Sequence, residues 1–265
     1  MKYIPSLLLL ALLMLSCKSD KKNALVETDS EEVIEEVVEL VETDFTISPV
    51  SHATMVLQWP DATIYVDPVG GGQTFEAYPD PDLIVITDIH GDHLNVETLE
   101  SISTSKTKII VPQAVADKLP ATLDAQVDVL NNGDIKERFG FLVEAIPMYN
   151  LREEALKFHE KGRGNGYVIQ KEGTRIYISG DTEDIPEMRA LEDIDVAFVC
   201  MNLPYTMTVK SAASAVVDFM PKKVYPYHYR GTDGLSDVSL FRTWIKKSGK
   251  WNEIEIVQLD WYPNQ

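Results

Sequence analysis

A buried strand that runs directly into a cluster of metal-ligand side chains constrains this chain more than any other feature. The apolar run Leu83–Ile86 is soon followed by Asp88, His90, Asp92 and His93. Residues two apart in an extended segment point the same way, so the first Asp–His pair can converge on one ion. The second pair is adjacent in sequence and can turn toward another ion, because the intervening glycine allows a sharp turn. Imidazole and carboxylate groups suit zinc, manganese or iron. The alternative is a polar loop whose histidine caps the next helix.

Short β-rich runs alternate with helical segments from Phe45 onward, and this mixing indicates an α/β fold with two sheets covered by helices on the outside. Hydrophobic periodicity and turn residues predict the individual elements. The predicted strands are Ala53–Gln58, Ala62–Val66, Leu83–Thr87, Lys108–Val111, Val127–Leu130, Phe141–Ile146, Gly166–Gln170, Arg175–Ser179, Asp195–Val199, Lys223–Tyr227 and Glu253–Gln258, and the predicted helices are Val96–Ile102, Gln113–Lys118, Ser211–Met220 and Ser236–Lys247.

Three more candidate ligands lie far along the chain. His159 stands in a polar loop, and Asp181 and His228 each come shortly after a predicted strand. Polar residues at the carboxyl ends of strands are where α/β proteins gather their sites. Each residue also has a plainer interpretation. The first is then a solvated loop histidine, the second a turn residue after Gly180, and the third a hydrogen-bonded histidine in an aromatic cluster.

The stretch from Thr87 to His93 resembles the T-H-x-H-x-D-H signature of the metallo-β-lactamase superfamily, with Asp88 where the first histidine usually stands. The similarity continues in order along the chain. It places the family's third histidine, its bridging carboxylate and its last histidine at His159, Asp181 and His228.

The resemblance covers the chain from Phe45 to the C-terminus and is closest to the branch that contains the ascorbate-6-phosphate lactonase. The segments Leu203–Met207 and Pro226–Tyr229 are similar to segments of that branch. It implies a four-layer αβ/βα sandwich and a centre of two divalent ions, zinc first, with manganese or ferrous iron as alternatives. The ligand set that it implies is Asp88, His90, Asp92, His93, His159, Asp181 and His228.

Asp88 departs from the family pattern. It either binds the first metal directly in place of a histidine or orients a neighbouring ligand. As a direct ligand, the harder carboxylate would shift the preference toward manganese or ferrous iron. His52 is the remaining histidine of the chain's five. It is a candidate for protonating a leaving group or holding a substrate oxygen, and the alternative is a hydrogen-bonded residue at a hairpin edge.

The N-terminus has the layout of a secretory signal. Lys2 precedes the apolar run Ile4–Leu15, which is too short to span a membrane, and Ser16 and Cys17 follow it. Leu15 to Cys17 resembles a bacterial lipobox, although Met14 replaces the usual leucine. We therefore expect a lipoprotein signal over residues 1–17 with a lipidated Cys17, and a location in the cell envelope, facing the periplasm.

Residues 18–44 hold three lysines and ten carboxylates without glycine or proline, and so acidic a segment is expected to be a disordered tether to the domain over residues 45–265. The other cysteine, Cys200, lies in an apolar run and is expected to be buried. The net charge of −18 argues against nucleic acid as a partner and leaves small molecules as substrates.

The combined features predict hydrolysis by a hydroxide held between two metal ions, with Asp92 orienting it. The bond is left open among lactone, ester, amide, thioester and phosphodiester, because the fold hosts them all. A non-catalytic metal-binding lipoprotein of the same fold is the alternative from another class. A true β-lactamase suits the envelope location but not the closer resemblance to the lactonase-like branch.

Overall fold

The computed structural model describes residues 44–263, which fall in one compact unit of the chain. The predicted signal segment and the predicted tether as far as residue 43 lie outside the described residues. No helix within residues 44–263 is both long enough and apolar enough to cross a membrane.

The first sheet contains six strands in sequence order, β1 to β6. Its first three strands form an antiparallel meander, and β3 to β6 then run parallel to one another. The strands are β1 (Thr46–Ser51), β2 (Thr54–Gln58), β3 (Thr63–Val66), β4 (Leu83–Val85), β5 (Lys108–Val111) and β6 (Val127–Val129).

The second sheet contains seven strands in the order β15-β12-β11-β10-β9-β8-β7. The pairs β7–β8, β8–β9 and β9–β10 are antiparallel, whereas the pairs β10–β11, β11–β12 and β12–β15 are parallel. The strands are β7 (Ile135–Arg138), β8 (Phe141–Met148), β9 (Gly164–Lys171), β10 (Thr174–Ile178), β11 (Val196–Val199), β12 (Lys223–Pro226) and β15 (Glu255–Ile256). A short ribbon of β13 (Arg230–Gly231) and β14 (Gly234–Leu235) follows the β12 end.

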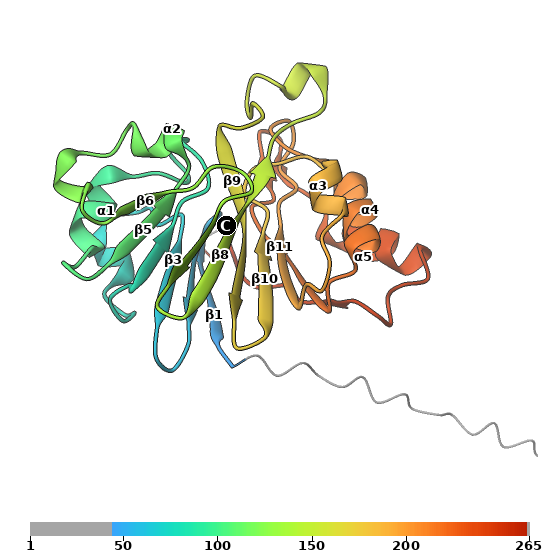
Figure 1. Ribbon diagram of the computed structural model, residues 1–265. Coiled ribbons are helices and arrows are strands. Elements are labelled where there is room, and N and C mark those ends of the chain that lie inside the picture. Colours follow the sequence, from blue (N-terminus) through green and yellow to red (C-terminus); the bar gives the residue numbers. More distant parts are fainter. Residues whose placement is uncertain (1–43, 264–265) are drawn as a thin grey trace, which may run out of the picture. The chain divides into compact units, whose positions relative to one another are not determined.

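The two sheets face each other, and helices cover their outer sides (Figure 1). Helices α1 (Val96–Ile102) and α2 (Gln113–Ala116) lie on the side of the first sheet, and α3 (Pro186–Arg189), α4 (Val209–Phe219) and α5 (Val238–Lys247) lie on the side of the second. Three short 3-10 turns, η1 (Gly72–Phe75), η2 (Ala121–Leu123) and η3 (Glu153–Ala155), complete the elements. This arrangement confirms the predicted four-layer αβ/βα sandwich.

Alternation along β2 explains why the first sheet is buried on both faces. Met55 and Leu57 belong to the core that also contains residues of the second sheet, whereas Val56 packs in the smaller core with α1. Successive side chains of a strand point to opposite faces, so one apolar run serves both cores. The buried thiol of Cys200 lies in the larger core, as the sequence predicts.

The differences from the predicted elements are two edge strands, shifted helix ends, and the short elements α3, β13 and β14, which were not predicted. Strands β1 and β7 were not predicted, because the first contains a proline and the second is the polar run Ile135–Arg138 with little apolar pattern. Helix α5 begins two residues later than predicted, because the Asp237 side chain accepts a hydrogen bond from the Leu240 N–H and caps it.

The topology brings several segments together at one end of the sandwich. Parallel strands in one sheet have their carboxyl ends at the same edge, so the residues after β3 and β4 are neighbours there. The residues that follow β10 and β12 meet in the same way at the second sheet. The candidate ligands come from these loops.

Candidate metal centre

The predicted ligands come together in three groups, two of which share His228. The groups are Asp88 with His90 and His159, His93 with Asp181 and His228, and His52 with Asp92 and His228, each with ligand atoms within 4.8 Å of one another. The turn after β4 separates the first two groups, since the backbone N–H groups of His93 and Leu94 both donate to the His90 carbonyl. Every residue predicted to bind metal is therefore in one of the groups, together with His52.

The group of His93, Asp181 and His228 has the spacing of ligands around one ion. His93 Nε2 lies 3.1 Å from His228 Nε2 and 3.4 Å from Asp181 Oδ2, and His228 Nε2 lies 3.3 Å from Asp181 Oδ1. Zinc–ligand bonds of about 2.0–2.1 Å in a tetrahedron place neighbouring ligand atoms roughly 3.3 Å apart. All three side chains are buried. Their donor atoms therefore fit a divalent ion.

A carboxylate that was not predicted from the sequence fixes the orientation of the His93 ring. Asp67, directly after β3, places Oδ2 2.8 Å from His93 Nδ1 and accepts the N–H and hydroxyl of Thr87, each at 2.7 Å. The Nδ1 proton of His93 is thereby directed at Asp67, and the lone pair of Nε2 faces the centre. Metal-binding histidines commonly have this support. The sequence signal was an aspartate directly after a buried strand.

His159 is oriented by the loop that carries it. The amide of Asn150 donates to the carbonyls of Ala155 and Tyr205, which uses both of its hydrogens. His159 Nδ1 lies 3.2 Å from the same Tyr205 carbonyl, to which it donates. Its Nε2 is buried without a hydrogen-bond partner among residues 44–263. An orphaned nitrogen at this place fits a metal ligand.

Asp181 lies between the first two groups. Its Oδ2 is 3.2 Å from His159 Nε2 and 3.4 Å from His93 Nε2, and its Oδ1 is buried without a hydrogen-bond partner among the described residues. Burial alone would raise the pKa of Asp181, but the adjacent His228 and His93 imidazoles hold that pKa well below its usual range. An ionised carboxylate shared by both groups is what a bridge between two ions requires.

Asp88 is held by an arginine as well as by its histidine. Its side chain is buried, with Arg163 Nε 3.1 Å from Oδ1 and Arg163 Nη2 2.9 Å from Oδ2. His90 Nδ1 is 2.7 Å from Oδ2, and His159 Nε2 is 3.8 Å from it. Burial would raise the pKa of Asp88, but His90, His93 and Arg163 lower it. The geometry is compatible with both roles that the sequence leaves open.

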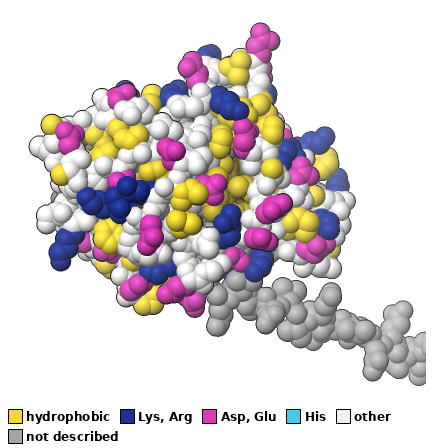
Figure 2. Space-filling model, viewed as in Figure 1, with side chains coloured by type: hydrophobic (Ala, Val, Ile, Leu, Met, Phe, Trp, Pro, Cys, Tyr) yellow, Lys and Arg dark blue, Asp and Glu magenta, His cyan; other side chains and the backbone are white. Residues whose placement is uncertain are grey.

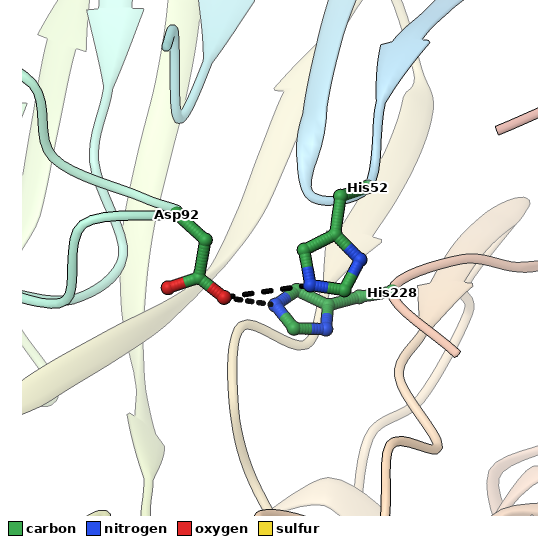
Figure 3. Close-up of side chains that lie close together, drawn as sticks. All are labelled: His52, Asp92 and His228. Carbon is green, nitrogen blue, oxygen red and sulfur yellow. Dashed lines mark ion pairs between the residues drawn. The ribbon is translucent and has the colours of Figure 1, made fainter. Parts of the chain in front are cut away.

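Asp92 lies beside two histidines, as Figure 3 shows. Its Oδ2 is 3.4 Å from both His52 Nε2 and His228 Nε2, and its Oδ1 is 3.8 Å from His93 Nε2. The side chain of Asp92 is 42% exposed, so it can also face a substrate. Burial lowers the pKa of His52, although the neighbouring Asp92 opposes the shift.

A cavity of about 270 Å³ opens at the centre. It is lined by His90, Asp92, Phe158, His159, Asp181, Asn202 and Tyr205.

The loop that contributes Phe158 and His159 is held in place by Glu183. The Glu183 carboxylate accepts hydrogen bonds from the N–H groups of Leu151 and Arg152 and from the Arg152 guanidinium. The same guanidinium donates to the Thr206 carbonyl, so the loop is tied to the segment that carries Tyr205.

The surface gives no sign of a nucleic-acid site on the face in view. Figure 2 shows Asp and Glu side chains interspersed with Lys and Arg, without a broad basic patch there. Nucleic-acid binding depends on clustered basic residues. The ligand groups and the cavity beside them define an α/β protein with a candidate metal centre.

Comparison of this chain with known proteins assigns it to one family. The profile of a beta-lactamase superfamily domain matches residues 46–228. A UPF0173 metal-dependent hydrolase from Thermococcus onnurineus is 30% identical over 174 residues, covering 63% of this chain and 76% of that protein. A crystal structure of a protein from Parabacteroides distasonis, described there as a metal-dependent hydrolase, is 37% identical with a TM-score of 0.73, covering 82% of this chain and 94% of that one. Igni18, a metallo hydrolase from Ignicoccus hospitalis, is 20% identical with a TM-score of 0.68 over 82% of this chain and 95% of its own, and it shares the fold.

The chain belongs to the metallo-β-lactamase superfamily and groups with its metal-dependent hydrolases. This confirms the resemblance at the level of superfamily and fold. The lactonase-like branch, the identity and number of the metals, and the lipid anchor stay predictions.

Proposed function

We propose that this chain hydrolyses a small molecule with two divalent ions bound at the centre. His90, His159 and Asp88 form the first position, and His93, His228 and Asp92 form the second. One observation carries the proposal most directly: Asp181 lies within 3.2–3.4 Å of imidazole nitrogens of both positions. Bound divalent ions supply a water of lowered pKa and polarise the group under attack.

Groups of the protein around the centre orient the ligands and the bound molecule. Asp67 and the Tyr205 carbonyl hold the rings of His93 and His159 with one nitrogen facing the centre. Asp92 is the exposed acid at the second position, and it is placed to orient the attacking water. Phe158 and Asn202 line the cavity and offer one apolar and one polar contact to a bound molecule.

The substrate class is tested by a screen of lactones, esters, thioesters, amides and phosphodiesters with metal-reconstituted protein. The resemblance to the lactonase-like branch supports beginning with lactones. Hydrolysis that chelation abolishes and added metal restores supports the proposal. A chromogenic cephalosporin in the same screen distinguishes a true β-lactamase. Metal binding without turnover of any class favours the second function, a metal-binding protein without catalysis.

The ion pair of Asp88 with Arg163 is the observation that favours that second function. The guanidinium already pairs with the carboxylate and adds a positive charge beside the first position, which weakens the attraction of that position for a divalent ion. A calorimetric titration separates the two functions. Two tightly bound ions favour the enzyme, whereas one ion that fills the second position favours the binding protein.

Asp88 provides a prediction about metal selectivity. If Asp88 Oδ2 is a ligand, Asp88→Ala lowers the occupancy of one ion and spares the other. Asp88→His, made together with Arg163→Met to avoid an unpaired buried cation, retains both ions and shifts the preference from manganese or ferrous iron toward zinc. Competition between metals followed by elemental analysis measures this. Unchanged content and selectivity in both variants would assign Asp88 to orienting His90 instead.

The lipid anchor belongs to the same proposal and concerns residues outside the described part of the chain. Cys17 follows the apolar run after Ser16, and a single lipobox-like cysteine is what lipidation requires. We expect Cys17→Ser to release the protein from the membrane fraction while its metal content is unchanged. Immunoblots of membrane and soluble fractions measure the release. A variant that fractionates with membranes as before would contradict the lipoprotein assignment.

A further inference from the structure

The ring of His52 is enclosed between the metal centre and the C-terminal segment. His52 follows β1 with a φ of 55°, in the left-handed region that non-glycine residues rarely adopt. Its N–H donates to the Trp261 carbonyl, and its own carbonyl accepts the His228 N–H. Such a conformation persists where surrounding contacts hold it. The position of this ring is therefore set by the structure around it.

The hydroxyl of Tyr262 determines which nitrogen of His52 carries the proton. The phenolic oxygen accepts the backbone N–H groups of Tyr229 and Arg230 at 3.0 and 3.1 Å. It also lies 2.7 Å from His52 Nδ1. A phenol has one hydrogen and two acceptor lone pairs, and both lone pairs are already used. The hydroxyl hydrogen must therefore point at His52 Nδ1, which accepts it and carries no proton.

The same count of donors and acceptors places the proton on Nδ1 in two histidines that face the centre. His93 Nδ1 faces the Asp67 carboxylate and His159 Nδ1 faces the Tyr205 carbonyl, and both of these partners are acceptors. Those two rings are protonated at Nδ1 and present a lone pair at Nε2. His52 is protonated at Nε2, so this atom has no lone pair for a metal. The group of His52, Asp92 and His228 is thus not a third metal site, although its atoms lie close together.

We propose that Tyr262 is a positioning residue that holds His52 in its Nε2–H form, so that His52 donates toward Asp92 Oδ2 and keeps that carboxylate in place. The distance from His52 Nε2 to this oxygen is 3.4 Å. Tyr262 lies beyond residues 46–228, the part that matches the superfamily profile. The inference relies on the proposed function only in assigning Asp92 to the second metal position.

Nitrogen NMR of the full chain with 15N-labelled histidine tests the inference directly. The chain has five histidines, so individual ring signals can be assigned by substitution. In the metal-loaded protein we expect His52 to show an unprotonated Nδ1 and a protonated Nε2. The inference is overturned if Nε2 is the unprotonated nitrogen, or if it couples to 113Cd bound at the centre. This measurement needs no turnover, so a failure to find hydrolysis would leave it unaffected.

Two tyrosine variants separate positioning from packing. Tyr262→Phe removes the hydroxyl that faces His52, and we expect it to populate the other tautomer and to weaken metal binding at the second position about 10- to 100-fold. Tyr229→Phe is the matched control, because its ring packs on Tyr262 but its hydroxyl contacts Gln258. It should preserve both the tautomer and the affinity. An unchanged His52 tautomer in Tyr262→Phe would contradict the positioning role.

Substitution of His52 itself completes the test. Glutamine can place an amide N–H near the position of Nε2, so His52→Gln should retain most of the metal affinity at the second position. His52→Leu has no donor and should lose about 10- to 100-fold. Equal affinities for the two variants, measured by competition with a chelating dye, would show that the donor to Asp92 is not what holds the carboxylate.

Discussion

Asp181→Ala is expected to lower the hydrolysis rate by more than about 10³-fold and to reduce the metal content below two ions per chain. The reason is the position of Asp181 between the two groups of histidines, where its carboxylate oxygens lie 3.2–3.4 Å from imidazole nitrogens of both groups. The fold should survive, because the residue lies in a loop after β10 and not within a strand. Kinetics and elemental analysis of the same preparation measure both effects.

Asp184→Ala is the matched control for this prediction. It removes a carboxylate from the same loop, but one that pairs with Arg189 outside the centre. Its metal content and rate should equal those of the unmodified protein. Full activity with two ions in Asp181→Ala would show that Asp181 neither bridges the ions nor is needed for hydrolysis.

Asp67→Ala is expected to have the second largest effect, and the effect should extend to stability. The carboxylate accepts hydrogen bonds from the Thr87 N–H, the Thr87 hydroxyl and His93 Nδ1, and all of these groups are buried. Removing one partner of such a buried network costs about 3–5 kcal/mol. Without it His93 is free to turn, so metal affinity should fall about 10- to 100-fold.

Urea unfolding of the metal-free protein separates the stability effect from the loss of metal. Asp67→Asn is the useful companion variant, because an amide keeps the volume and one acceptor but loses the charge. It should be less destabilising than Asp67→Ala and still weaken metal binding. A free energy of unfolding unchanged in Asp67→Ala would show that Asp67 does not hold the loop after β4 together.

The fold was predictable because most of its strands are strongly apolar. Runs such as Leu83–Val85 and Val196–Val199 are buried throughout, and such apolar runs are recognisable in the sequence. The edge strands lack this signal. Strand β7 alternates exposed and half-buried residues, and its place in the sheet depends on pairing with β8, a contact made only when the whole sheet forms.

The candidate ligands were predictable for a related reason, since Asp88, Asp181 and His228 stand just after strands whose ends meet at one end of the sandwich. The residues that support them were not. Arg163 reaches Asp88 across 75 positions of sequence, and Tyr262 reaches His52 across 210. Contacts between such distant residues follow from the packing of the two sheets and leave no local pattern in the sequence.

The metal content of the purified protein tests the central claim most directly. The protein is stripped with a chelator, reconstituted with zinc, manganese or ferrous iron, and dialysed before elemental analysis. The arrangement of two groups of ligands around Asp181 predicts two ions per chain, both lost on chelation. A protein that retains one divalent ion or none with each of these metals would contradict the account.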